Sequence, residues 1–188
     1  KDLEYSHTTA GEMFFKLVVG VQRMSSVVDE IPVYISERVP GIIKIQDQEL
    51  IVLDGQLRSR REEVDGHSEH YVYMFATEAT DEVKTAIPNE INIEGYLCKP
   101  VVVRETPQGR TVADLLIAVN RGNGKSDYLP CITWGRNAHF AESLNVGTHI
   151  LAKGRLQSRT YQKTINNETI TKTAYEVSIS LLQVLAEE

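Results

Sequence analysis

The sequence lacks the features that mark several large classes of protein. Its 188 residues include two cysteines, Cys98 and Cys131, too few for the disulfide framework of a small secreted domain. No apolar run approaches the roughly 20 residues that a membrane helix needs, and no signal-peptide pattern opens the chain. We therefore expect free thiols and a cytoplasmic protein.

Catalytic and metal-binding patterns are also missing. No Ser/His/Asp order, paired-carboxylate setting or G-x-x-x-x-G-K-[ST] phosphate loop stands out. His67 and His70 form an H-x-x-H pattern, but no nearby cysteine or acidic ligand set completes a zinc site. The sequence predicts no enzyme, no cofactor and no metal.

Charge is spread unevenly along the chain. The composition is 41% hydrophobic and 24% charged, with a formal net charge of −6. Residues 1–85 hold 9 basic and 16 acidic side chains, whereas residues 86–188 hold 11 and 10. The two halves therefore differ electrostatically, and the whole-chain average does not describe either of them.

The second half of the chain repeats the first, with order and spacing preserved. Four segment pairs align: Glu12–Arg23 with Ala113–Arg121, Val28–Arg38 with Ser126–Arg136, Ile51–Arg60 with Ile150–Arg159, and His70–Ala79 with Ala174–Leu185. The third pair shares the phrase Gly-x-Leu-x-Ser-Arg. We predict two domains, 1–85 and 86–188, joined near the polar stretch Thr80–Glu90.

The second copy has the pattern of short strands joined by turns. Apolar and polar residues alternate in Asn89–Cys98, turn residues fill Thr106–Arg110 and Arg121–Lys125, and Thr164–Ile170 reads as a polar loop. Asn137–Gly147 looks like the one helix, with Asn137 as its cap. We predict a mainly β protein of two tandem OB-folds, which are five-stranded Greek-key barrels.

The first copy is incomplete at its start. Nothing before Leu3 corresponds to the opening strand of the second copy, and Leu3–Phe15 fits only the later part, Val101–Leu116. A barrel without its first strand has an open edge. We expect that strand to come from a segment before residue 1 or from another chain.

One predicted surface of the second barrel combines flat rings with cations. Period-2 alternation places Tyr128 and Trp134 on one face of their strand. On the strand after the helix, one face carries Arg155, Gln157, Arg159 and Tyr161. Because a buried unpaired guanidinium is very costly, this face is expected to point outward. Rings stack on unpaired bases at about 1–3 kcal/mol per base, and cations neutralise phosphates.

Two functions remain open at this point. A lone tryptophan such as Trp134 is more often a core or edge residue, and surface arginines are usually only solvated. The combination favours sequence-independent binding of single-stranded nucleic acid. The alternative is an OB-fold protein–protein assembly module that does not contact DNA directly.

The first copy lacks the three rings at the aligned positions. Its residues there are Glu30, Ser36 and Glu62. With its acidic balance, this domain should repel a polyanion. We predict a degenerate acidic domain that scaffolds, dimerises or recruits a partner, while the second domain binds.

Residues Asn89–Leu185 resemble the bacterial and phage single-stranded DNA-binding protein family. The resemblance rests on an aromatic residue, a second aromatic followed by Gly-Arg, a helix, and Gly-x-Leu-x-Ser-Arg-x-aromatic. It implies stacking by Tyr128, Trp134 and Tyr161, and a strand path lined by Arg155, Gln157 and Arg159. Further cations expected to meet phosphates are Arg121, Lys125, Arg136 and Lys163.

The same resemblance implies a biological setting. It suggests roles in DNA replication, recombination and repair, close to the nucleoid, with replication and repair proteins as partners. The tandem arrangement resembles two-domain family members in which a homodimer supplies four barrels. One departure is the turn Arg121–Lys125, where family members commonly carry a further tryptophan and this chain has none.

Overall fold

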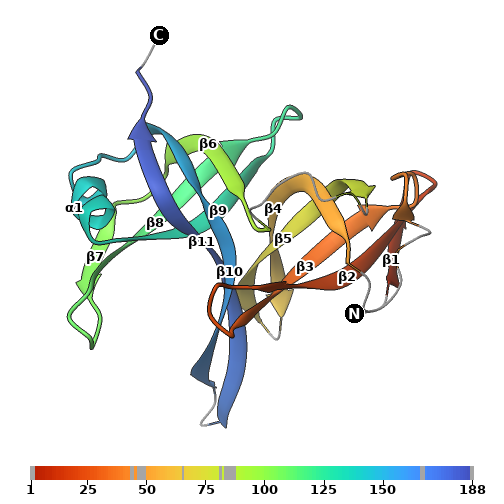
Figure 1. Cartoon of the computed structure of the whole chain (residues 1–188), viewed down its shortest axis with the longest axis horizontal. Coiled ribbons are helices and arrows are strands. Elements are labelled where there is room, and N and C mark those ends of the chain that lie inside the picture. The colour runs from red at the N-terminus through yellow and green to blue at the C-terminus, as the bar shows by residue number, and fades with distance from the viewer. Residues whose placement is uncertain are drawn as a thin grey trace. The chain divides into compact units, whose positions relative to one another are not determined.

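The computed structural model describes residues 3–42, 45, 50–64, 66–80, 82, 88–165 and 168–186. The chain divides into two compact units, Lys1–Pro88 and Asn89–Glu188, and is mainly β in both (Figure 1). Each unit is an OB-fold-type sheet. In the part of the chain that the structure describes, no helix has the length and apolar character to cross a membrane.

The C-terminal unit is a closed barrel. Its elements are β6 (Ile91–Leu97), β7 (Val102–Glu105), β8 (Thr111–Asn120), β9 (Ser126–Trp134), α1 (Arg136–Glu142), β10 (His149–Ile165) and β11 (Glu168–Val184). The sheet order is β6-β10-β11-β9-β8-β7, and β6 also pairs with β8, which closes the barrel. The core is aliphatic and includes Leu97, Ile117, Leu129, Ile150, Leu156 and Val177.

The strands β10 and β11 form a long hairpin that extends past the rest of their unit (Figure 1). Its register shifts at Lys153/Gly154, and a Cβ added to Gly154 would lie 2.1 Å from the Ser178 carbonyl oxygen. Only glycine fits this bulge. The expected polar loop at Thr164–Ile170 is wrong for most of its length, because Ile165 still pairs with Glu168; the two residues between them lie outside the described part.

The structure has the predicted turn at Arg121–Lys125, but its helix differs from the predicted one. Arg121–Lys125 is a turn closed by an Arg121 N–H to Lys125 carbonyl bond of 2.7 Å, as the sequence predicts. The helix is shorter than expected and starts at Arg136, with Gly135 at its N-cap and no side-chain cap. The Asn137 side chain instead donates to the Ser180 carbonyl oxygen on β11.

The N-terminal unit has the same plan without closure. Its strands are β1 (Glu4–Thr9), β2 (Glu12–Gln22), β3 (Val28–Ser36), β4 (Val52–Val64) and β5 (His67–Thr80), in the order β1-β2-β3-β5-β4. β5 runs parallel to β3, as β11 does to β9. Among the described residues, no strand takes the place that β6 has in the C-terminal unit. The prediction of a first barrel without its opening strand is confirmed.

The two cysteines are free, and Cys131 is buried. Desolvation by burial is the main cause that raises the pKa of the Cys131 thiol, so the reactive thiolate is suppressed at neutral pH. We expect Cys131 to react with Ellman's reagent only as fast as the C-terminal unit unfolds. Stopped-flow absorbance checks this, and rapid labelling of both cysteines in the folded protein would contradict it.

Candidate nucleic-acid interface

The C-terminal unit presents one sheet face away from its core, which we call the outer face. Ser178 on β11 lies opposite Arg155 on β10 and pairs with Ile132 on β9. Because alternate residues of a strand share a face, Tyr128 and Trp134 lie on the same side of the sheet as this row, although Ile132 itself is buried. Each of these two rings is 41% exposed, so neither belongs to the core.

The three predicted rings form a track rather than one cluster. Tyr128 and Trp134 are six residues apart on β9, about 20 Å at roughly 3.3 Å per residue. Tyr161 lies opposite Lys172 on the protruding β10–β11 hairpin and is 37% exposed. A ligand that meets all three rings must therefore be extended, and a single-stranded chain has that form.

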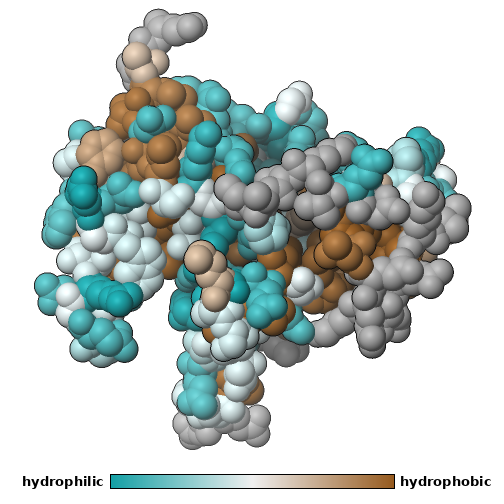
Figure 2. All heavy atoms as spheres, in the orientation of Figure 1, coloured by the Kyte–Doolittle hydropathy of each residue, from teal (hydrophilic) through white to brown (hydrophobic). Residues whose placement is uncertain are grey.

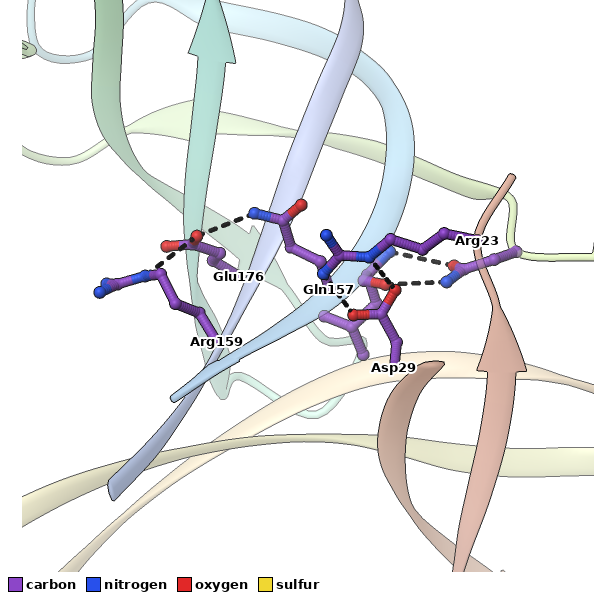
Figure 3. A network of polar contacts seen from close by, with 7 residues as sticks. Arg23, Asp29, Gln157, Arg159 and Glu176 are labelled. Carbon is purple, nitrogen blue, oxygen red and sulfur yellow. Dashed lines mark hydrogen bonds and ion pairs between the residues drawn. The ribbon is translucent and has the colours of Figure 1, made fainter. Parts of the chain in front are cut away.

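Arg159, which lies beside Tyr161, forms an ion pair with Glu176 (Figure 3). The Arg159 Nε atom lies 3.6 Å from the Glu176 Oε1 atom, and the Arg159 guanidinium carbon is 5.6 Å from the centre of the Tyr161 ring. The Gln157 side chain donates to the same Glu176 oxygen at 2.9 Å. Gln157 is only 9% exposed, so the expectation that it lies open on this face is wrong. The Gln157 side chain is hydrogen-bonded to Glu176, which lies opposite it on β11.

Asn89 fixes the course of β10 beside the outer face. Its side-chain amide donates to the Leu156 carbonyl oxygen at 2.8 Å and accepts from the Leu156 N–H at 3.0 Å. Leu156 is buried in the core, which turns Arg155 to the opposite side. Among the described residues, Arg155 has no hydrogen-bond or ion-pair partner, so its charge is open to a ligand.

Arg121 is engaged inside its own unit. Its guanidinium makes a two-pronged bond to the carboxylate of Asp127, which is 2% exposed. The N-terminal unit contains the same pair, with Arg23 bonded to Asp29 at 2.8 and 2.7 Å. A pair kept in both units holds the turn between two strands, and we withdraw Arg121 from the expected phosphate contacts.

The remaining predicted cations differ in placement. Lys125 is exposed in the turn before β9, and Arg136 is exposed as the first residue of α1. The side chain of Lys163 lies outside the described part of the structure. Lys125 and Arg136 thus remain candidates for phosphate contacts at the two ends of β9.

Two arginines near Trp134 were missed by sequence reasoning. A hollow of about 310 Å³ is lined by Arg110, Thr111, Trp134 and Gly135. Arg104 lies opposite Val112, which in turn lies opposite Trp134. The Asp114 carboxylate accepts two bonds from Arg104, at 2.7 and 3.1 Å, and thereby raises the pKa of that guanidinium. The alternation of residues on the two strands that flank the predicted turn Thr106–Arg110 is the sequence signal that points to them.

These features define a tandem OB-fold protein with a ring-and-guanidinium face on its C-terminal barrel. Residues 88–185 match the profile of the Single-strand binding protein family. This chain belongs to that family.

Known relatives agree with this membership. Single-stranded DNA-binding protein A of Bacillus subtilis is 37% identical over 81 residues, which are 39% of this chain and 47% of that protein. Single-stranded DNA-binding protein 2 of Listeria innocua is 28% identical over 102 residues, or 50% and 64% of the two chains. The chain spans about half the length of the first of these relatives.

Both units share their fold with a solved protein. The crystal structure of the wild-type single-stranded DNA binding protein from Thermus aquaticus superposes with a TM-score of 0.76 at 21% identity. The similarity covers 99% of this chain and 88% of that one. The tandem fold is therefore shared, although the sequences have diverged widely.

Proposed function

We propose that this protein binds single-stranded DNA without sequence preference, through the outer face of its C-terminal unit. The observation that carries the proposal is the exposure of Tyr128, Trp134 and Tyr161 along one face, with Arg155 and Arg159 beside them. Family membership supports it, as do relatives that are named single-stranded DNA-binding proteins.

The contacts explain why sequence would matter little. Every base has a π-face, so stacking on the rings does not distinguish one base from another. Arginines meet phosphates, which are the same at every nucleotide. The protein would act as a binding protein rather than an enzyme, in replication, recombination and repair, in the cytoplasm near the nucleoid.

We further propose a homodimer that brings together four barrels. Hydrophobic side chains gather over the end of β11, where Leu181 and Val184 are 39% and 47% exposed (Figure 2). Exposed apolar groups of this kind often mark an interface. Light scattering of the protein with and without oligo(dT) tests the dimer, and a monomer at micromolar concentration in both samples would contradict it.

Binding is expected to weaken steeply with salt. The logarithm of the association constant for oligo(dT) should fall linearly with the logarithm of salt concentration, with a slope of about −0.7 per neutralised phosphate. The change Arg155→Gln should make this slope shallower by roughly 0.7, because that guanidinium has no acidic partner in the part of the chain that the structure describes. Fluorescence anisotropy of a labelled oligonucleotide measures the slope.

Lys99→Gln is the matched control, since it removes the same charge from an exposed residue between β6 and β7. Its slope should equal that of the parent protein. Equal slopes for all three proteins would remove Arg155 from the interface. If the parent itself shows no binding at low salt, a role confined to protein–protein assembly is favoured instead.

A further inference from the structure

The N-terminal unit carries its own cluster of rings and arginines on the matching side of its sheet. Cross-strand pairs place these side chains on one face: Tyr34 opposite Phe75, Tyr73 opposite Arg58, and Tyr71 opposite Arg60. The residues on the other side, including Val33, Ile35 and Val72, form the core. We call the cluster of Phe14, Tyr34, Arg58, Arg60, Tyr71, Tyr73 and Phe75 the N-terminal ring face.

Four rings of this face form two contacting pairs. The Tyr34 and Tyr73 ring centres are 4.9 Å apart. Phe14 lies 6.0 Å from Phe75 and stacks at 5.0 Å on His7. These rings come from four strands, β1, β2, β3 and β5, and Phe14, Tyr34, Tyr73 and Phe75 are each half-buried.

Two guanidinium groups complete the surface. The Arg58 guanidinium carbon lies 3.6 Å from the centre of the Phe75 ring. The Arg60 guanidinium carbon lies within 5.7 Å of three tyrosine rings, and Arg60 donates to the Tyr34 hydroxyl at 2.9 Å. Aromatic rings and arginine planes are the two kinds of flat surface on which unpaired bases stack.

The rings occupy different positions from those of the C-terminal unit. Aligning the two bulges and the two parallel strand pairs sets Tyr34 against Ile132, Tyr73 against Glu176 and Phe75 against Ser178. The aligned positions Glu30, Ser36 and Glu62 hold no ring, as the sequence indicates. The rings of the N-terminal unit lie mainly on β5, so its outer face also carries aromatic groups.

We propose that the N-terminal ring face is a second stacking surface for single-stranded nucleic acid, used when the strand is longer than one barrel can hold. The choice of ligand rests on the function proposed above. The surface lies on the same side of the same fold as the proposed interface, and it offers the same pairing of rings with guanidinium groups. This proposal differs from the expectation that the acidic unit scaffolds, dimerises or recruits a partner while the second domain alone binds.

Its electrostatics differ from those of the C-terminal face. Glu62 lies 2.9 Å from Arg60, and Glu69 accepts a bond of 2.8 Å from the Tyr71 hydroxyl. These acids offset the arginines, so the face should attract phosphates weakly. Binding here comes from short-range stacking, and its contribution should change little with salt.

Photocrosslinking of the unaltered chain tests the placement directly. Oligo(dT) of about 30 nucleotides, carrying 5-iodouracil at single positions, is irradiated with the protein and the linked peptides are identified by mass spectrometry. We expect links to Tyr34, Tyr73 or Phe75 as well as to rings after residue 88. Links confined to residues 89–188 at every probe position overturn the inference.

A pair of variants measures the stacking. Tyr34→Leu/Tyr73→Leu removes two π-faces but keeps apolar bulk, and Tyr34→Phe/Tyr73→Phe keeps the rings. The leucine pair should weaken binding of the 30-nucleotide probe by about fivefold or more, and the phenylalanine pair should not. An oligonucleotide of about 8 nucleotides, which fills one barrel, should bind all three proteins alike at the C-terminal face.

The single tryptophan separates this inference from the proposed function. Trp134 belongs to the C-terminal unit, so quenching of its fluorescence by the short oligonucleotide reports that unit alone. Quenching together with unchanged affinity of the leucine pair for the long probe overturns only the N-terminal surface. No quenching and no binding by any probe overturns both.

Discussion

Replacing Trp134 and Tyr161 together with alanine is expected to weaken binding of oligo(dT) by roughly 2–6 kcal/mol, because each ring that stacks on a base contributes about 1–3 kcal/mol. This corresponds to a loss of about 30-fold at the lower end. Both rings are more than one-third exposed. Their removal should therefore cost the barrel little stability, and the loss should appear in binding alone.

Anisotropy of a labelled oligonucleotide is the suitable measurement, since the variant has lost the only tryptophan. Trp134→Phe/Tyr161→Phe keeps two rings and should retain most of the affinity. Phe140→Ala is the matched control, because Phe140 is also 41% exposed but lies on α1. An alanine pair that binds like the parent, or a Phe140→Ala variant that loses as much, would reject the stacking track.

The repeated phrase Gly-x-Leu-x-Ser-Arg is explained mainly by the fold. Gly154 and Gly55 each sit at a bulge where an added Cβ would meet a backbone carbonyl oxygen, at 2.1 and 2.2 Å. Leu156 follows in the core. The phrase therefore marks the same bend in both barrels. The residues after the phrase differ, with Tyr161 in one unit and Glu62 in the other, because the bulge does not constrain them.

The alternation of residues along single strands was enough to predict much of the site. It placed Tyr128, Trp134 and Tyr161 outward, and the structure has them exposed. It failed wherever a neighbour on another element decides the outcome. Gln157 is buried because Glu176 lies opposite it on β11, and no pattern within β10 contains that partner.

The N-terminal unit shows the limit of comparing aligned positions. The N-terminal unit has no ring at the three aligned positions. Rings at other positions share the same face. Tyr73 and Phe75 belong to β5, and their nearness to Tyr34 on β3 depends on a parallel pairing between strands far apart in the sequence. The register was needed to see the cluster.

Replacing Arg121 with alanine is expected to destabilise the C-terminal unit by about 3–5 kcal/mol, because it removes the guanidinium that is paired with the buried Asp127 carboxylate. Asp127 is 2% exposed. Urea unfolding followed by Trp134 fluorescence reports this unit. Arg23→Ala breaks the equivalent pair in the N-terminal unit. It should leave the urea midpoint of the Trp134 transition unchanged, while circular dichroism should show that the N-terminal unit unfolds at lower urea concentration.

The exposed ion pair of Arg104 and Asp114 is the control for the buried pair of Arg121 and Asp127. Its side chains are 51% and 39% exposed, so Arg104→Ala should cost about 0–1 kcal/mol. At temperatures where it is folded, Arg121→Ala should keep the salt slope of the parent, since its guanidinium faces Asp127 rather than a phosphate. A shallower slope with unchanged stability would contradict the structural role and return Arg121 to the nucleic-acid interface.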